Sequence, residues 1–161
     1  MAAEQRCGVL VVGVGNSNRS DDAVGIVVAK RLSELWGDGV TVLEHGGEGT
    51  GLMETWAGRD TVILVDAVSS GGTPGTVHRI DARKTPIPIG LFPHSSHAFG
   101  VAEAVELGRA LGRLPPRLLV YGVVGERFAS GNGLTGAVEA AVREVVGFIV
   151  RDVQAVARRT G

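Results

Sequence analysis

Short apolar runs alternate along this chain with longer segments of helical periodicity. Residues 8–13 and 61–65 are apolar runs with the length of buried strands, and the second run ends at Asp66. Apolar positions three and four residues apart predict a helix from Asp21 to Trp36. The same reasoning predicts strands over 40–43, 76–80 and 118–123, and helices over 52–57, over 98–111 and from 134 onward.

This alternation of strands and helices predicts an α/β fold. We expect a three-layer α/β/α sandwich around a mostly parallel, twisted sheet of about five strands, with residues 76–80 as an edge strand. No repeat, low-complexity tract or linker interrupts the pattern, so residues 1–161 are expected to form one domain. The proline-rich segment 82–96 is expected to be a long irregular loop.

The composition excludes several classes of protein. Sixteen basic and seventeen acidic residues give a formal charge of −1, which argues against nucleic acid or an anionic membrane as a partner. No apolar run approaches the length of about 20 residues that a membrane span needs. Cys7 is the single cysteine, so no internal disulfide forms. With an N-terminus that leads straight into a strand, these features predict a cytoplasmic protein, and a monomer is the default.

Three polar residues are expected to meet at one edge of the predicted sheet. Asp22 follows the first strand, Asp66 ends the third, and His97 begins the helix after the proline-rich loop. Ligands of open parallel sheets bind at the carboxyl ends of the strands, where all three would lie. Two carboxylates and an imidazole suit a divalent transition metal and leave coordination positions open. The arrangement therefore predicts a metal-contacting site.

Each of these residues also has a simpler interpretation. Asp21 is expected to be an N-cap or an acid in the first helical turn, and Asp22 alone would fit the same role. Asp66 would then only accept hydrogen bonds from the following loop, and His97 would only occupy a first turn. The combination on one edge favours the site. Three other histidines are spare candidates: His45, His78 and His94.

Nucleotide-binding motifs fit the glycine turn poorly. Gly13-Val14-Gly15 resembles the start of a dinucleotide fingerprint, but Asn18 stands where the third glycine belongs. The adjacent carboxylates of Asp21 and Asp22 would repel a pyrophosphate. The chain also lacks a phosphate-binding Gly-Lys-Ser/Thr, a His-Glu-x-x-His helix and a Gly-x-Ser-x-Gly elbow.

Three ordered blocks resemble the hydrogenase maturation endopeptidases, which trim the C-terminus of the large subunit of nickel–iron hydrogenases. The first is the glycine-rich block 13–25 with its paired acids, and the second is the Gly-Arg-Asp block 58–68, which continues into Pro74-Gly75-Thr76-Val77. The third is Ser95-Ser96-His97, followed by a helix. The likeness extends through Pro115-Pro116 and Gly122-Val123 and covers nearly the whole chain.

The resemblance implies that Asp22, Asp66 and His97 are the catalytic and metal-contacting residues. It implies an endopeptidase that removes a C-terminal extension from the nickel-loaded large-subunit precursor, with the nickel supplied by that precursor rather than permanently bound. Two features depart from the family pattern. The segment 45–51 replaces the usual Asp-Gly-Gly-Thr-x-Gly loop, and Ala23 replaces a frequent glycine.

Alternatives of different classes stay open at the level of the sequence. One is another hydrolase on the same scaffold that holds a resident metal ion. A second is a non-catalytic chaperone that senses nickel insertion, and a third, weakened by Asn18, is a nucleotide-binding module. The sequence also leaves open how the peptide bond is attacked. A metal can polarise the carbonyl or bind the water, or a carboxylate can act as a base on free water.

Overall fold

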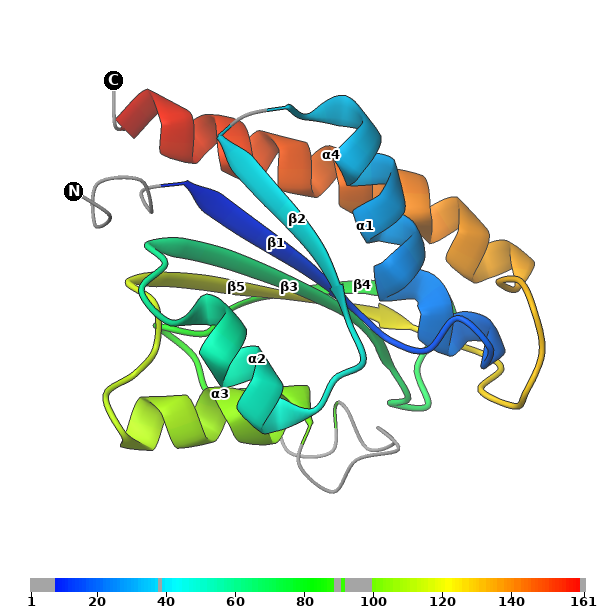
Figure 1. The fold of residues 1–161 in the computed structure, drawn as a ribbon. Helices are drawn as coiled ribbons and strands as arrows, with labels where there is room; N and C mark the ends of the chain where they lie inside the picture. The colour runs from blue at the N-terminus through cyan, green and yellow to red at the C-terminus, as the bar shows by residue number, and fades with distance from the viewer. Residues whose placement is uncertain (1–7, 38, 89–90, 92–99, 160–161) are drawn as a thin grey trace.

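A central five-stranded sheet lies between two pairs of helices in this computed structural model, which describes residues 8–37, 39–88, 91 and 100–159 (Figure 1). The strand order is β2-β1-β3-β5-β4. The first four of these are parallel, and β4 pairs with β5 in the antiparallel sense at one margin. The predicted mostly parallel α/β/α sandwich is confirmed. The predicted edge strand is β4, and the structure adds that it runs antiparallel to its neighbour.

The elements follow the predicted order, with small shifts at their ends. The strands are β1 Val9–Val14, β2 Val40–His45, β3 Thr61–Val68, β4 Val77–Asp81 and β5 Arg117–Val124. The helices are a 3-10 turn η2 Ser20–Ala23, α1 Val24–Leu35, α2 Gly49–Trp56, α3 Val101–Ala110 and α4 Gly136–Arg159.

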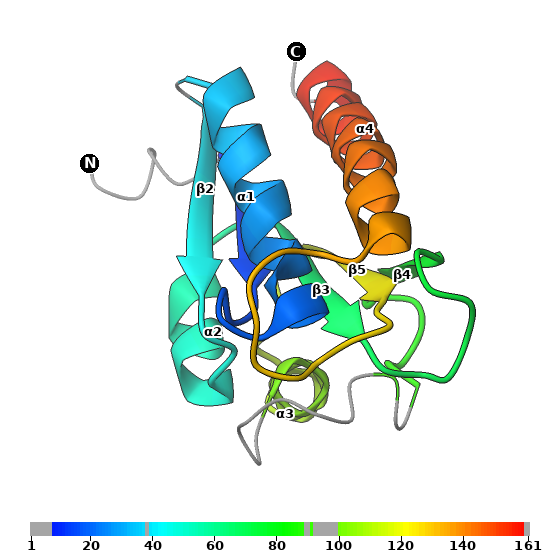
Figure 2. The same ribbon diagram turned by 90° about the vertical axis from the view of Figure 1, so that its right-hand side faces the viewer.

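Two apolar layers form because neighbouring residues of each strand point to opposite faces of the sheet. Helices α1 and α4 cover one face, and α2 and α3 cover the other (Figure 2). Six apolar residues of α4 recur three or four positions apart, from Val138 to Val156. Five of them are buried: Val138, Val142, Val145, Ile149 and Val153. Among the described residues, no helix is long and apolar enough to cross a membrane.

Two predicted boundaries are wrong for identifiable reasons. The apolar run predicts that β3 ends at Asp66, but β3 continues to Val68 because it still pairs there with Val124 of β5. Helix α2 begins at Gly49 rather than at residue 52. The side chain of Glu48 accepts hydrogen bonds from the N–H groups of Thr50 and Gly51, and this cap starts the helix earlier.

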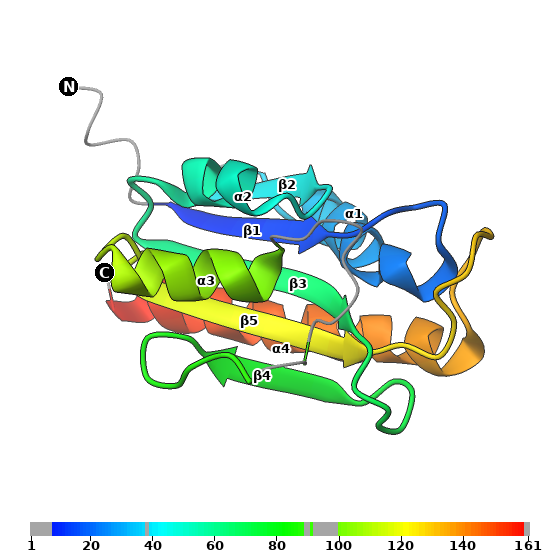
Figure 3. The ribbon, with the colours of Figure 1, turned by 90° about the horizontal axis from the view of Figure 1, so that it is seen from below.

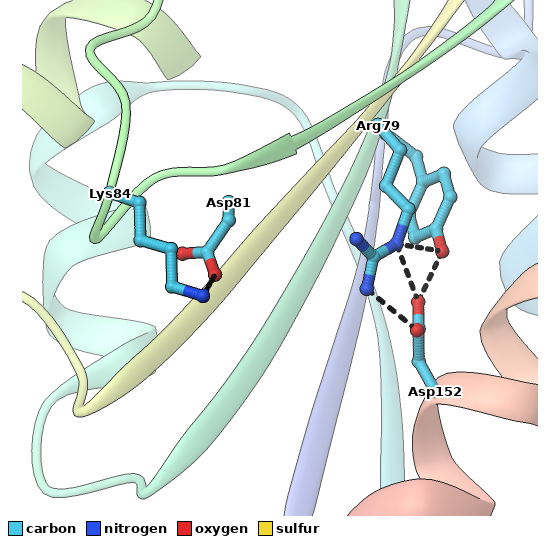
Figure 4. Close-up of polar contacts among 5 residues, drawn as sticks. Arg79, Asp81, Lys84 and Asp152 are labelled. Atoms are coloured by element: carbon cyan, nitrogen blue, oxygen red, sulfur yellow. Dashed lines mark hydrogen bonds and ion pairs between the residues drawn. The ribbon is translucent and has the colours of Figure 1, made fainter.

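A polar network ties α4 to the strands beneath it (Figure 4). Arg79 of β4 donates to the hydroxyl of Tyr121 at 3.1 Å and to Asp152 of α4 at 2.8 Å, and the Tyr121 hydroxyl also donates to Asp152. Burial and the neighbouring Asp152 carboxylate both raise the pKa of Tyr121, so this phenol stays protonated. The Asp152 carboxylate thus joins helix α4 to strands β4 and β5.

We expect Asp152→Ala to lower the free energy of unfolding by about 2 kcal/mol, because it leaves the buried Tyr121 hydroxyl without its acceptor. Lys84→Ala is the control. Its ammonium lies 3.9 Å from Asp81 in an exposed pair, so its loss is expected to cost less than about 0.5 kcal/mol. Urea unfolding of both variants measures the difference, and equal losses would contradict the role of the network.

Candidate active site

The start of α1 lies unusually close to the sheet because two glycines face each other there. A methyl group on Gly25 would lie 2.3 Å from the carbonyl oxygens of Val14 and Val65, and one on Gly13 would lie 2.1 Å from the carbonyl oxygen of Gly25. Neither position accepts a side chain. This contact holds the turn that carries Asp22 against the carboxyl ends of β1 and β3.

Asp66 lies where β1 stops pairing with β3. The last β1–β3 pair joins Gly13 and Val65, whereas Asp66 still pairs with Gly122 on its other side. The Asp66 side chain is 7% exposed, and its Oδ1 accepts a hydrogen bond of 2.8 Å from the N–H of Ala67. The end of β1 thus leaves room for a second acidic side chain beside this buried carboxyl group.

The charge of Asp22 acts on the buried carboxyl group of Asp66. Burial raises the pKa of Asp66 well above its usual range, the nearby Asp22 charge raises it further, and the Ala67 N–H partly opposes both. Burial also raises the pKa of Asp22, against the effects of Arg19 and of the Asn16 N–H. Two carboxylates in one partly desolvated place favour sharing a proton or binding a cation. The structure therefore brings together two of the three predicted site residues.

His97, the third predicted residue, lies outside the described part of the chain, as does the spare candidate His94. The helix that follows, α3, begins at Val101, where Glu103 accepts a hydrogen bond from the Gly100 N–H. Helix α3 runs against the direction of β5, so its first turn is the end nearer to the carboxyl edge (Figure 3). The role of His97 stays a prediction.

Asp21 has a larger role than the sequence suggests. It is fully buried, yet Arg19 rather than Asp21 is the N-cap of η2. The Asp21 carboxylate accepts four hydrogen bonds of 2.8–3.0 Å, from the N–H groups of Glu126, Arg127 and Thr135 and from the Thr135 hydroxyl. Although burial opposes ionisation, these bonds lower the pKa of Asp21. Asp21 thus lies in the first turn of η2, as predicted, but it is not the cap, and its carboxylate clamps a distant loop.

The loop clamped by Asp21 spans residues 125–135, between β5 and α4, and lies along the carboxyl edge (Figure 2). Ser20 completes the attachment. Its hydroxyl donates to the carbonyl of Ala129 at 2.9 Å, its N–H donates to that of Gly131, and its own backbone has a φ of 51°. A buried non-glycine residue with positive φ is strained, so the surrounding hydrogen bonds must hold it. No local pattern in the sequence predicts these contacts, because they join segments more than 100 residues apart.

The spare histidines occupy different places. His45 ends β2, and its carbonyl accepts the Gly15 N–H at 3.0 Å, so the divergent segment 45–51 also lies at the carboxyl edge. His78 of β4 pairs with Gly122, which in turn pairs with Asp66. Two strand spacings of about 4.8 Å separate the backbones of His78 and Asp66. Among the described residues, no three His, Cys, Asp or Glu side chains form a group able to hold a metal ion.

Comparisons with known proteins agree with this geometry. The family model for "hydrogenase maturation protease" matches residues 26–152, a range that includes Asp66 and His97 and begins just after Asp22. The hydrogenase 2 maturation protease of Escherichia coli K12 is 34% identical over 139 residues, which cover 83% of each chain. The hydrogenase expression/formation protein HoxM of Azotobacter vinelandii is 29% identical over 158 residues, 93% of this chain and 76% of its own.

Solved structures show the same fold. The hydrogenase maturating endopeptidase HybD from Escherichia coli superposes with a TM-score of 0.78 at 29% identity and covers 92% of this chain and 93% of its own. The solution structure of an endopeptidase from Escherichia coli gives a TM-score of 0.76 at 33% identity, with 96% and 94% coverage.

We expect Asp21→Asn to lower the free energy of unfolding by about 2 kcal/mol at neutral pH, because an amide NH₂ cannot accept the hydrogen bonds that the carboxylate accepts. The folded pKa of Asp21 is lowered, so its stabilisation is present above the unfolded value of about 3.9 and is lost as the pH falls through the folded pKa. Urea unfolding across this range should therefore show the gap between wild type and variant closing in acid. A gap that widens in acid would contradict the clamp.

Asp66→Asn is expected to change stability in the opposite direction. The folded pKa of Asp66 is raised, so the wild type loses stability as the pH rises from about 3.9 through the folded pKa, whereas asparagine stays neutral. Its Oδ1 keeps the hydrogen bond from Ala67. The variant should be more stable than the wild type at pH 7, with the gain vanishing near pH 4. A variant less stable at pH 7 would show that the ionised carboxylate is well accommodated.

Proposed function

The chain belongs to the hydrogenase maturation protease family, and we propose that it removes a C-terminal extension from the nickel-loaded precursor of a nickel–iron hydrogenase large subunit. The observation that carries the proposal is the pair Asp22 and Asp66, two carboxyl groups with raised pKa values at the carboxyl edge of the sheet. Family membership indicates the reaction class, peptide hydrolysis. The acidic pair offers groups that can contact a metal ion and accept a proton.

The nickel ion enters this site as part of the substrate. Asp22, Asp66 and His97 would form an oxygen and nitrogen donor set that suits Ni²⁺ and leaves positions for ligands of the precursor. The fit rests on the repulsion between the Asp22 charge and the buried Asp66 carboxylate, which a divalent cation would relieve. Such a site would respond to metal loading, because burial and the Asp22 charge both disfavour the ionised form of Asp66 and a bound cation would favour it. When bound, the nickel supplies positive charge that polarises nearby carbonyl groups.

Peptide hydrolysis also needs a proton acceptor, and the carboxylate pair supplies one. A carboxyl group whose pKa is raised by burial takes up protons more readily than an exposed aspartate. A water oxygen adds to the scissile carbonyl carbon while its proton moves to the carboxylate. The C–N bond then breaks, and the same proton passes to the leaving amine. The loop 125–135, held by Asp21, lines this edge of the sheet beside the acids.

We expect Asp22→Asn, Asp66→Asn and His97→Ala each to reduce release of the extension from the nickel-loaded precursor by about 100-fold or more, as removal of a proton acceptor or ligand does. Mass spectrometry of the precursor measures the shortening. Asp81→Asn, the same chemical change on β4 where an amide oxygen still accepts the Arg83 N–H, is the matched control and should keep full activity. Full activity in all three site variants would overturn the assignment.

Two further outcomes would replace the proposal. A precursor that binds this protein but never shortens would indicate a checkpoint for nickel insertion rather than an enzyme. Stoichiometric metal in the purified protein, measured by elemental analysis, would indicate a hydrolase with a resident metal ion.

A further inference from the structure

Strand β2 forms one margin of the sheet, and within the described residues its backbone pairs with β1 alone (Figure 2). The strand runs from Val40 to His45, and at Leu43 it carries a large apolar side chain that is 40% exposed. An exposed edge strand presents backbone groups on which another extended chain can pair. The other margin, β4, is antiparallel to its neighbour and ends at the opposite edge of the sheet.

The hydrogen bonds at the end of β2 identify which backbone groups face outward. The carbonyl of His45 accepts the N–H of Gly15, so His45 faces β1. Successive residues of a strand direct their N–H and C=O groups to alternate sides, so Leu43 also faces β1. Val40, Val42 and Glu44 therefore present their backbone groups to the outer side of β2.

The outer edge of β2 is continuous with the candidate active site. The Gly15 N–H that bonds to His45 belongs to the turn that leads to Asp22. This turn is tightly packed, because a methyl group on Gly15 would lie 2.0 Å from the carbonyl oxygen of Asp22. The carboxyl end of β2 thus meets the acidic pair through one hydrogen bond and one backbone contact.

We propose that the outer edge of β2 binds an extended segment of the precursor's C-terminal region as an added sixth strand, which presents the scissile bond to the carboxyl edge. The inference rests on the proposed function and names how its substrate is held. Backbone hydrogen bonds to Val40, Val42 and Glu44 would supply the affinity, as in other cases of strand addition. Leu43, which points to the α2 and α3 face, would select an apolar residue beside it.

A peptide fits this edge better than a second copy of the chain. A stable dimer buries about 1,200 Å² or more, most of it through apolar contacts at the core of the interface. A strand of six residues with one exposed large apolar side chain offers little such area. An extended peptide can bind through hydrogen bonds to the outward backbone groups of β2 and needs no large apolar area.

The spacing of the sheet sets the length of the bound segment. A strand added outside β2 lies three strand spacings from β3, or about 14 Å. An extended chain covers this distance in about four or five residues. The docked segment should therefore lie about four or five residues from the bond that reaches Asp66.

Glu44→Pro tests the docking edge. Proline removes an outward N–H that β1 does not use, a change that edge strands tolerate, and its ring blocks the approach of a neighbouring strand. With the nickel-loaded precursor, we expect kcat/KM to fall about tenfold or more, mainly through a higher KM. Glu44→Ala removes the same exposed side chain but keeps the N–H, so its kcat/KM should fall much less than that of Glu44→Pro.

Hydrogen exchange gives a second readout that needs neither cleavage nor a proline variant. In the Asp66→Asn protein mixed with precursor, the amides of Val42 and Glu44 should exchange at least tenfold more slowly than in the free protein. Leu43 and His45, which already face β1, should change less. Wild-type activity of a folded Glu44→Pro variant, or unchanged exchange at both outward amides, would overturn the inference.

Two other outcomes, a second copy of the chain on β2 and a failure of the proposed function, give different results in the same experiments. Protection of Val42 and Glu44 without precursor, together with a dimer in sedimentation, would assign the edge to a second copy and overturn the inference. A wild-type protein that leaves the precursor uncut would refute the proposed function, whereas exchange at the two amides would still decide whether the precursor docks on β2.

Discussion

The close approach of α1 to the sheet at Gly13 and Gly25 is the constraint on which the site depends. With a methyl group 2.1–2.3 Å from backbone oxygens at either position, the helix would have to move away from β1 and β3. Asp22 precedes Gly25 by less than one helical turn, so any such movement would carry its carboxyl group away from Asp66. The electrostatic coupling of the two acids is therefore a consequence of backbone packing, not of a side-chain contact.

Two adjacent aspartates are placed in opposite environments by this packing. Asp21 receives four hydrogen bonds, which lower its pKa and stabilise the charged form. Asp22 and Asp66 receive few donors, so burial raises their pKa values. The fold thus stabilises the charged form of Asp21, which holds the loop 125–135. It disfavours the charged form of Asp22, and a cation or a proton would relieve this cost. Stabilising contacts beside a strained site are a common arrangement in enzymes.

The carboxyl edge joins three separate features of the molecule. The acidic pair lies at the ends of β1 and β3, the clamped loop follows β5, and the free edge of β2 ends beside the turn that contains Gly15. The precursor proposed as substrate would have to bring its C-terminal segment to this edge. An open strand beside the acids would orient an extended segment through backbone groups and so tolerate many sequences.

The sequence by itself determined the alternation of elements, the buried strands and the stripe of the last helix, because these follow from local hydrophobic periodicity. It also placed Asp22 and Asp66 at one edge, since the carboxyl ends of parallel strands meet there. Only the tertiary structure decided the continuation of β3 beyond Asp66, which depends on its partner β5, and the role of Asp21, which depends on a loop more than 100 residues away. Such long-range contacts leave no periodic signal in the sequence. The sequence therefore predicts where Asp22 and Asp66 meet but not which contacts hold them there.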